Sequence, residues 1–328
     1  MAILFMGGEE IDFAQHGTVS VGTLQTQFRT DYARCSLNVA GGSSLGNRWH
    51  ATFTQGSGDF WVGARVLLPT GNLLGDPGRP FMAFYDGTKL RLALQMDANR
   101  AINLVTYDDA MTSSKIASSS GSQPTNLMKI DVQITYSTPG TVRVFVNQTE
   151  VITYTGNDLV KNATTQLSGV SLASPSTATD LSYWSEVIAA ERDTRTLMLK
   201  THVPTATNAG NQWQGAYTDI DEVAANEADG ISTNAVDQVA MFGVSDLPEG
   251  NLAIRGFKVS GYAARGETGP ANAQLGLTTN GNTAFSTNRS VDTGWTRISN
   301  IWETNPVSGS PWTASEINAL SIGVRSRT

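Results

Sequence analysis

The chain has a single cysteine, Cys35, and three histidines among its 328 residues. One cysteine excludes an intrachain disulfide and a thiolate metal site. Charged residues make up only 16% of the chain, the net charge is −7, and no cluster of Lys and Arg is present. Proteins that bind duplex nucleic acid neutralise phosphates with basic side chains, so we expect no nucleic-acid partner.

Long apolar segments are also missing. No run approaches the ~20 apolar residues that span a membrane, so we expect no membrane insertion. Residues 1–8 contain no basic segment, and their apolar run is shorter than the core of a signal peptide. We therefore expect the protein to be made in a cytoplasm without signal-peptide export.

The single thiol leaves two interpretations open. A buried Cys35 acting as a small apolar side chain is favoured, because free cysteine usually has this role. The alternative is a disulfide between Cys35 and another chain in an assembly.

Alternating apolar and polar residues are the most prominent pattern that is present. Met128, Ile130, Val132 and Ile134 alternate with polar residues across 128–136. Side chains of a strand point to opposite faces in turn, so this pattern predicts a half-buried antiparallel strand. The same pattern predicts strands at 60–68, 90–96, 101–107, 141–146, 150–155 and 181–190.

A charged segment, 191–195, follows the last of these strands. We place a domain boundary there, which gives domains 1–193 and 194–328, with 195–202 as a connecting strand. Further strands are predicted at 238–244, 252–259, 273–277, 295–302 and 320–324. Thr313 and Glu316 have the spacing of a capping box, which predicts a short helix after Pro311. The fold class is therefore all-β, with two tandem antiparallel β-sandwiches and a short C-terminal helix.

The segment Trp61–Gly156 resembles the laminin-G and concanavalin A-like sandwich family. The resemblance is carried by the strand pair 128–136 and 141–146, which is followed by Asn147-Gln148 and the strand 150–155. Gln148 stands where that family usually has Gly. The resemblance covers roughly residues 1–190 and implies a concanavalin A-like first domain.

The C-terminal string from Ile301 to Thr313 leads into Glu316–Val324. With 259–265 before it, this string is similar to the endings of structural proteins of tailed bacteriophages. The resemblance implies a jelly-roll-like second domain and a virion component of the tail, neck or capsid surface. It also implies other virion proteins as partners, several copies or a homo-oligomer, and assembly in the host cytoplasm.

One short motif invites a catalytic interpretation. Glu10, Asp12 and Gln15 match the Glu-Ile-Asp-x-x-Glu string of concanavalin-like glucanases, with Gln15 at the position of the acid/base. A glutamine amide cannot donate and recover a proton, and retaining hydrolysis needs two carboxyl groups about 5–5.5 Å apart. We therefore expect an ordinary opening strand at 8–15.

Other candidate chemistry is weaker. The acidic cluster Asp219, Asp221 and Glu222 suits either a calcium ion or, as we favour, a solvated loop. The histidines, His16, His50 and His202, are too widely spaced for a zinc motif. A Ser-His-Asp triad stays open, because its members meet only in space. We assign no catalytic, cofactor-binding or metal-binding residue.

Trp213 and Tyr217 are the candidate contacts with a ligand or partner. They lie in a polar stretch where an aromatic ring can stack on a sugar, although packing in the core is the favoured alternative. Our first hypothesis is a non-catalytic virion structural protein of a tailed phage that docks to other virion subunits. The second is a host-attachment adhesin that binds surface polysaccharide, and the third is a glycan-degrading hydrolase.

Overall fold

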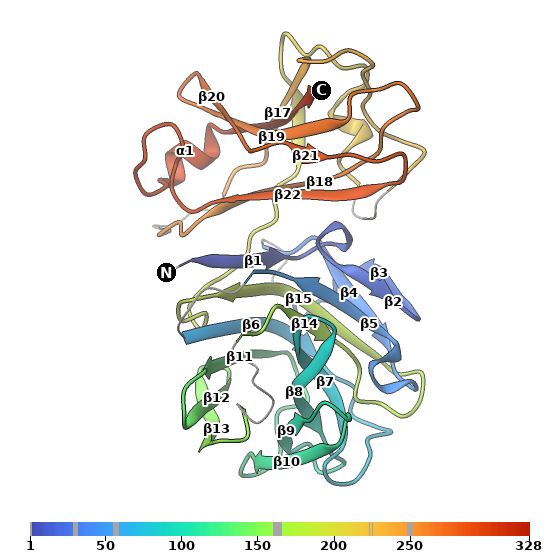
Figure 1. Cartoon of the computed structure of the whole chain (residues 1–328), viewed down its shortest axis with the longest axis vertical. Helices are drawn as coiled ribbons and strands as arrows, with labels where there is room; N and C mark the ends of the chain where they lie inside the picture. Colours follow the sequence, from blue (N-terminus) through green and yellow to red (C-terminus); the bar gives the residue numbers. More distant parts are fainter. Residues whose placement is uncertain are drawn as a thin grey trace. The chain divides into compact units, whose positions relative to one another are not determined.

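The structure is a computed structural model that describes residues 2–28, 32–54, 59–159, 166–222, 224, 226–247 and 252–328. Within these ranges the chain forms two compact units, Met1–Leu199 (unit 1) and Lys200–Thr328 (unit 2). Antiparallel strands dominate both units, and the helices are short (Figure 1). The all-β prediction is therefore confirmed.

Unit 1 consists of two antiparallel sheets. The first has eight strands in the order β13-β12-β11-β6-β15-β4-β3, with β1 also paired to β15. Its strands are β1 (Ile3–Gly7), β3 (Val19–Thr23), β4 (Cys35–Ala40), β6 (Asp59–Leu67), β11 (Met128–Thr135), β12 (Gly140–Val146), β13 (Thr149–Gly156) and β15 (Leu181–Ala190). All of their pairings are antiparallel.

The second sheet has seven strands in the order β10-β9-β8-β7-β14-β5-β2. They are β2 (Ala14–His16), β5 (Arg48–Thr52), β7 (Arg79–Asp86), β8 (Lys89–Met96), β9 (Ile102–Tyr107), β10 (Ser113–Ser118) and β14 (Gly169–Leu172). Two 3-10 turns, η1 (Glu10–Asp12) and η2 (Ser44–Gly46), lie between strands. The β-sandwich expected for the first half is thus present.

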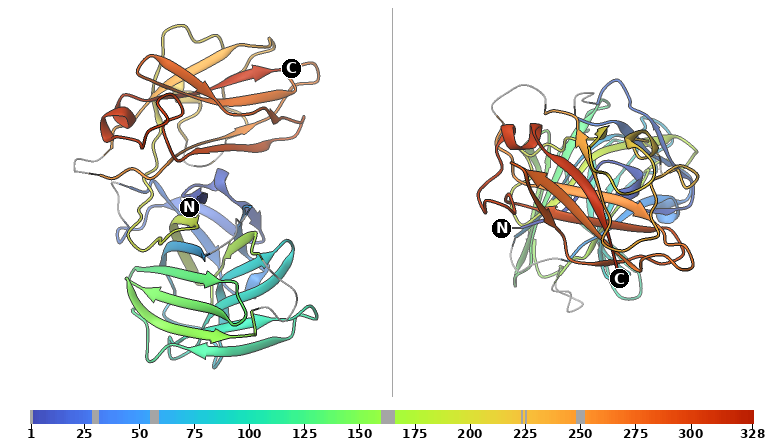
Figure 2. Two further views of the ribbon diagram at one scale, coloured as in Figure 1. Left: turned by 60° about the vertical axis from the view of Figure 1, so that its left-hand side comes forward. Right: turned by 90° about the horizontal axis from the view of Figure 1, so that it is seen from above.

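The core of unit 1 lies between the inner faces of the two sheets, which lie face to face (Figure 2). Met128, Ile130, Val132 and Ile134 of β11 are fully buried there, as the alternating pattern predicted. The second sheet contributes large side chains such as Trp49 to the same cluster. Burial of these apolar side chains is the main force that holds the sheets together.

β7 lacks alternation because both of its faces are buried. Phe81, Met82 and Phe84 belong to the main core, whereas Ala83 and Tyr85 belong to a second cluster on the opposite face of the sheet. A strand that is covered on both faces reads as a continuous apolar run. For this reason the sequence pattern did not predict β7.

Unit 2 contains a six-stranded sheet and a two-stranded ribbon, both antiparallel. The sheet order is β16-β17-β23-β19-β20, with β21 paired to β19, and the ribbon is β18-β22. The elements are β16 (Pro204–Thr207), η3 (Tyr217–Asp219), β17 (Val239–Val244), β18 (Phe257–Ala263), β19 (Asn272–Thr279), β20 (Asn282–Phe285), β21 (Arg289–Ser290), β22 (Thr296–Trp302), α1 (Ala314–Asn318) and β23 (Ser321–Arg327). The strand expected at 252–259 begins only at Phe257, and residues 252–256 contain no strand.

The predicted C-terminal helix is present as α1. Thr313 Oγ1 accepts the backbone N–H of Glu316 at 3.2 Å, and Glu316 Oε2 accepts that of Thr313 at 2.9 Å. This is the predicted capping box. Trp312 is buried, and its indole N–H donates to the Trp302 carbonyl at 2.9 Å, which fixes the start of the helix against β22.

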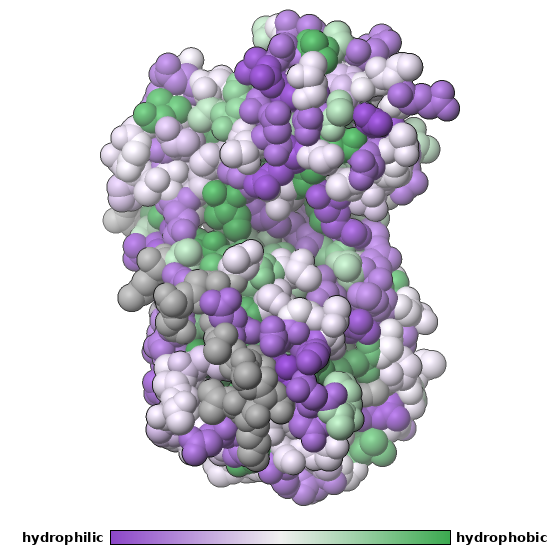
Figure 3. Space-filling model, in the orientation of Figure 1, coloured by the Kyte–Doolittle hydropathy of each residue, from purple (hydrophilic) through white to green (hydrophobic). Residues whose placement is uncertain are grey.

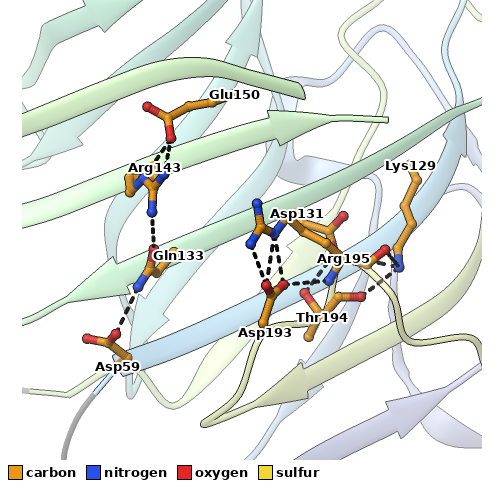
Figure 4. Close-up of polar contacts among 9 residues, drawn as sticks. All are labelled: Asp59, Lys129, Asp131, Gln133, Arg143, Glu150, Asp193, Thr194 and Arg195. Atoms are coloured by element: carbon orange, nitrogen blue, oxygen red, sulfur yellow. Dashed lines mark hydrogen bonds and ion pairs between the residues drawn. The ribbon is translucent and has the colours of Figure 1, made fainter. Parts of the chain in front are cut away.

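Residues 191–199 lie on the outer face of the first sheet (Figure 4). Lys129 of β11 donates through Nζ to the carbonyls of Thr194, Arg195 and Leu197 at 2.6, 3.0 and 2.7 Å. The carbonyls of this segment are therefore bonded to a side chain rather than to a neighbouring strand. The connecting strand expected at 195–202 is absent.

Asp131 shows how tightly this segment packs. The alternating pattern predicted an exposed polar face for its strand, yet Asp131 is 0% exposed and accepts the Thr194 hydroxyl at 2.7 Å. Gly63 provides the room, because a Cβ there would lie 2.4 Å from Asp131 Oδ1 and 2.9 Å from Thr194 Oγ1. The units divide after Leu199, a few residues beyond the boundary placed at 191–195 from the sequence.

The visible surface is mainly hydrophilic or near neutral in hydropathy (Figure 3). Within the described ranges, no helix has the length and the apolar character that crossing a membrane requires. Among the described residues, the exposed large apolar side chains are Leu74, Met111, Leu181, Met198, Val236, Trp295 and Val307.

Candidate functional site

The structure places Trp213 and Tyr217 in unit 2, on the segment between β16 and β17. Both are half-buried. The indole N–H of Trp213 donates to the Gln238 carbonyl at 3.0 Å, and Tyr217 begins η3. The Trp213 hydrogen bond fixes its ring to the strand region that follows, which is a structural use of this side chain.

The Glu-Ile-Asp motif forms a turn rather than the expected opening strand. β1 ends at Gly7, η1 covers Glu10–Asp12, and β2 begins only at Ala14. Asp12 Oδ2 accepts the backbone N–H groups of Gly8 and Glu9 at 3.0 and 3.2 Å, and the Gln15 amide donates to the Glu10 carboxylate. These hydrogen bonds close the chain between the two sheets, so the strand prediction at 8–15 is wrong.

Two ionisable groups lie beside this turn, the buried Cys35 and the half-buried Glu9. Cys35 is fully buried, and its thiol donates to the Gly8 carbonyl at 3.5 Å. Burial raises the pKa of Cys35 to about 12. The favoured interpretation of a small buried side chain agrees with this environment, whereas a disulfide to another chain needs an accessible sulfur. Burial also raises the pKa of Glu9 to about 7, against the opposing effect of Arg34 at 3.2 Å.

The acidic cluster in unit 2 has a structural role in part. Asp219 Oδ2 accepts the backbone N–H of Ala216 at 2.8 Å and so closes η3. In the part of the chain that the structure describes, no group of three or more His, Cys, Asp or Glu side chains is placed to hold a metal ion.

The outer face of the second sheet of unit 1 carries a row of small side chains. The strand register places Ser171 of β14 beside Ala83 of β7, Ala83 beside Ala93 of β8, and Ala93 beside Val105 of β9. Their neighbours along the strands belong to the main core, so these four point away from it. All four are fully buried nevertheless, which means that larger side chains lie over them. We call them the small-residue row.

His50 of β5 is one of the side chains that lie over this face. Its Nδ1 is 2.8 Å from Ser171 Oγ on the neighbouring strand. A Cβ at Gly169 would come within 3.0 Å of the His50 ring, so the ring lies over this glycine. The ring then reaches Tyr85 of β7, with the ring centroids 5.1 Å apart and the planes at 85°. Because Gly169 has no side chain, the His50 imidazole can lie across β14 and reach Tyr85.

Tyr107 of β9 lies over the other end of the row. Its hydroxyl accepts the Gln95 side-chain amide at 2.7 Å. Gln95 is paired with Asn103, four residues before Tyr107 on the same strand. To reach Gln95, the Tyr107 side chain must extend back across the small-residue row. Burial raises the pKa of its hydroxyl, so Tyr107 stays neutral at pH 7.

Fixed polar groups flank these rings. Arg91 of β8 is 7% exposed and forms ion pairs with Asp109 at 2.9 Å and Asp86 at 3.8 Å. Gln95 is 4% exposed and bonded to Tyr107. Aromatic rings beside a few well-ordered polar groups are typical of surfaces that bind small polar ligands.

His16 and Arg48 lie at one edge of this face. They are directly opposite each other on β2 and β5, and β2 is the last strand of the sheet. The His16 and His50 ring centroids are 6.1 Å apart. Burial first, and then the charge of Arg48, lower the pKa of both histidines, that of His50 to about 4. Both imidazoles are therefore mainly neutral at pH 7.

Little in the sequence indicated this face. His16 and His50 are far apart in the chain, and only the pairing of β2 with β5 brings them together. Tyr85 lies one residue before the end of β7, which was not predicted, and Tyr107 ends the predicted strand β9. No motif surrounds either tyrosine. The one available signal was the run of Ser and Ala on outward positions, which is recognisable only once the strand register is known.

A second aromatic pair lies on the ribbon of unit 2. Tyr262 of β18 and Trp295 stack with their centroids 5.5 Å apart and their planes at 15°. The Arg297 guanidinium lies 5.3 Å from the centre of the Tyr262 ring, and Trp295 is 37% exposed. Sequence reasoning did not select these residues either.

No protein-family model matches the chain, and no curated protein matches it. Among solved structures, the cellulose induced protein Cip1 is 17% identical with a TM-score of 0.40, over 57% of this chain and 92% of that chain. The carbohydrate binding module CBM66 from Bacillus subtilis is 12% identical with a TM-score of 0.34, over 55% and 95%. The carbohydrate esterase vb_24B_21 from the Shiga toxin-encoding bacteriophage phi24B is 13% identical with a TM-score of 0.38, over 55% and 90%. All three TM-scores are below 0.5, so nothing about function follows from these likenesses.

Proposed function

We propose that this chain is a non-catalytic glycan-binding protein of a tailed-phage particle, and that the outer face of the second sheet of unit 1 binds the glycan. The observation that carries the proposal is the pair of half-buried rings along the small-residue row, His50 and Tyr107, with the buried Tyr85 packed against His50. This face lies on a rigid sheet, so the rings are held in place before a ligand arrives.

The chemistry of a sugar fits these groups. A sugar ring has apolar C–H patches on its faces and hydroxyl groups around its edge. The C–H patches suit aromatic rings. The hydroxyls suit the neutral imidazoles of His16 and His50, which are half-buried and each carry one donor and one acceptor nitrogen. The buried Gln95 and Ser171 side chains hydrogen-bond to Tyr107 and His50, so these two rings lose little side-chain entropy on binding.

In a virion, even a binding site of low affinity can contribute to attachment. The C-terminal string 301–324, which is similar to the endings of phage structural proteins, is the basis for this part of the proposal. A particle that carries several copies binds a polysaccharide at several points, so that modest affinity per site becomes strong attachment. Unit 2 then has the role of docking to other virion subunits.

We propose binding without hydrolysis because the carboxylates on this face are engaged in ion pairs. Asp86 and Asp109 both face Arg91, and Asp109 also faces Lys89 at 2.9 Å. Hydrogen bonds from Lys89 and Arg91 lower the pKa of Asp109. A glycoside hydrolase needs one carboxyl group that is protonated near neutral pH, and these contacts favour the opposite state.

The proposal is tested by replacing Tyr107 with Ala in the full chain. We expect Tyr107→Ala to weaken binding about tenfold on a panel of acidic and neutral polysaccharides, because a ring that contacts the sugar is lost. Tyr183→Ala is the matched control, since Tyr183 is a half-buried tyrosine of β15 in the first sheet. Its binding should equal that of the parent, and melting curves should show that both variants are folded.

Three outcomes would overturn the proposal. They are absence of binding to every polysaccharide of the panel, equal binding by parent and Tyr107→Ala, or a loss caused instead by Tyr262→Ala in unit 2. The polymer should also keep its chain length during incubation. New reducing or unsaturated ends would contradict the non-catalytic part of the proposal.

A further inference from the structure

We propose that the glycan is anionic, and that Arg48 binds its acidic group together with His16 and His50 at the β2–β5 edge of the outer face. This inference rests on the proposed glycan-binding function and adds the chemical class of the ligand. The acidic group is a carboxylate, as in a uronate, or a sulfate, and both present oxygen pairs that suit an arginine.

The first argument is that Arg48 has no counter-ion among the residues that the structure describes. The other basic side chains of this face form ion pairs: Arg91 with Asp86 and Asp109, and Lys89 with Asp109. Arg48 donates through Nη1 to the Leu45 carbonyl at 2.6 Å. Among the described residues no carboxylate lies within ion-pair distance of Arg48.

The second argument is that the neighbouring groups favour an anion. His16 lies directly opposite Arg48 in the register, and His50 follows Arg48 by two residues on the same face of β5. Their neutral imidazoles offer N–H donors beside the guanidinium. An uncompensated positive charge in a partly buried place costs free energy, and a bound anion would offset that cost.

The third argument is continuity with the aromatic rings. The His50 ring lies 6.1 Å from His16 and 5.1 Å from Tyr85, so it connects the edge with the small-residue row. From β9 to β2 the sheet crosses five strand spacings, or roughly 24 Å. A polysaccharide crossing the strands would place sugar faces near Tyr107 and His50 and an acidic group near Arg48, and the buried Tyr85 supports the His50 ring.

The test compares matched ligands that differ only in charge. Oligogalacturonate, oligoglucuronate and alginate oligosaccharides are compared with their methyl esters, which keep the sugar ring and remove the carboxylate. Dextran sulfate is compared with dextran. The full chain should bind at least one acidic ligand at least about tenfold more tightly than its neutral counterpart. A preference for the uronates over their methyl esters would identify the bound group as a carboxylate, and a preference for dextran sulfate over dextran would identify it as a sulfate.

Arg48→Gln should abolish this preference while leaving binding of the neutral counterpart unchanged. Arg48→Lys keeps the charge and should retain part of the preference, which guards against a folding defect in the Gln variant. Arg143→Gln, on the first sheet, is the control and should behave like the parent.

The pKa values of His16 and His50 provide a second measurement, which reports on the proposed anion site itself. A bound anion should raise the pKa of His16 and His50, because it opposes the field of Arg48, while Tyr85 is the other titratable group that faces His50. NMR titration of the two imidazoles with and without the acidic oligosaccharide measures this shift. Equal binding of acidic and neutral ligands, or an unchanged preference in Arg48→Gln, would overturn the inference and leave glycan binding intact. No binding to any glycan would instead refute the proposed function itself.

Discussion

Glu9 is a carboxyl side chain enclosed in unit 1 beside a single basic group. Its side chain is 12% exposed, and its Oε1 lies 3.2 Å from Arg34. Burial raises the pKa of Glu9 from 4.5 to about 7, although Arg34 acts in the opposite direction. Desolvation therefore outweighs the ion pair at this position, as is common for buried carboxylates.

This balance predicts a pH-dependent effect of Glu9→Gln. A carboxyl group whose pKa is higher in the folded state binds its proton more tightly when folded. Its contribution to stability is greatest below about 4.5 and is lost as the pH rises through about 7. The Gln variant stays neutral, so relative to the parent it should gain roughly 3 kcal/mol between pH 4 and pH 8. Urea unfolding at both pH values measures this, and an equal difference at the two values would contradict it.

The residues of the candidate site were harder to predict than those of the core. His16 and His50 meet only because β2 pairs with β5, and the orientation of the His50 ring depends on the missing side chain at Gly169. No local pattern records either fact. The capping pair Thr313 and Glu316 was predictable because its chemistry is local to four residues.

At the scale of the elements, the segment 191–199 is held by β11. Lys129 donates to three of its carbonyls, and Thr194 donates to the buried Asp131 (Figure 4). Arg195 also lies over the rings of Phe145 and Trp61, 4.5 and 5.5 Å from their centres. This segment therefore completes the outer surface of the first sheet.

Lys129→Met should destabilise unit 1 by about 3 kcal/mol. The substitution leaves Asp131 in the interior without its neighbouring positive charge, and it leaves three carbonyls without their donor. Lys89→Met is the matched control, because the Lys89–Asp109 ion pair is exposed, and it should change stability little. Urea unfolding gives both values. A Lys129 variant as stable as the Lys89 variant would show that the segment is not anchored in this way.

The two strands β11 and β7 explain which elements were predictable. β11 keeps a strict alternation, because its inner face is wholly apolar and its outer face is polar even where it is covered. β7 is apolar on both faces, so it gave no periodic signal. The pattern of β11 also gave one wrong prediction, because it indicated that Asp131 is exposed. Asp131 is buried by the segment 191–199, which is distant in the sequence.

At the scale of the whole molecule, the sequence predicted an all-β chain of two units, because turn residues and alternation recur along most of its length. The boundary placed at 191–195 from the sequence lies a few residues before the division after Leu199. Composition drew attention to Trp213 and Tyr217, whereas the best-organised aromatic and polar groups lie on strands of unit 1. The function of the face depends on the register between strands, which no single segment contains.

The most direct measurement is a crystal structure of the full chain with an oligosaccharide chosen from the binding panel. We predict that the sugar lies on the outer face of the second sheet, with rings against Tyr107 and His50 and its acidic group near Arg48. An oligosaccharide bound instead on Tyr262 and Trp295 of unit 2, with the outer face of the second sheet empty, would contradict the account.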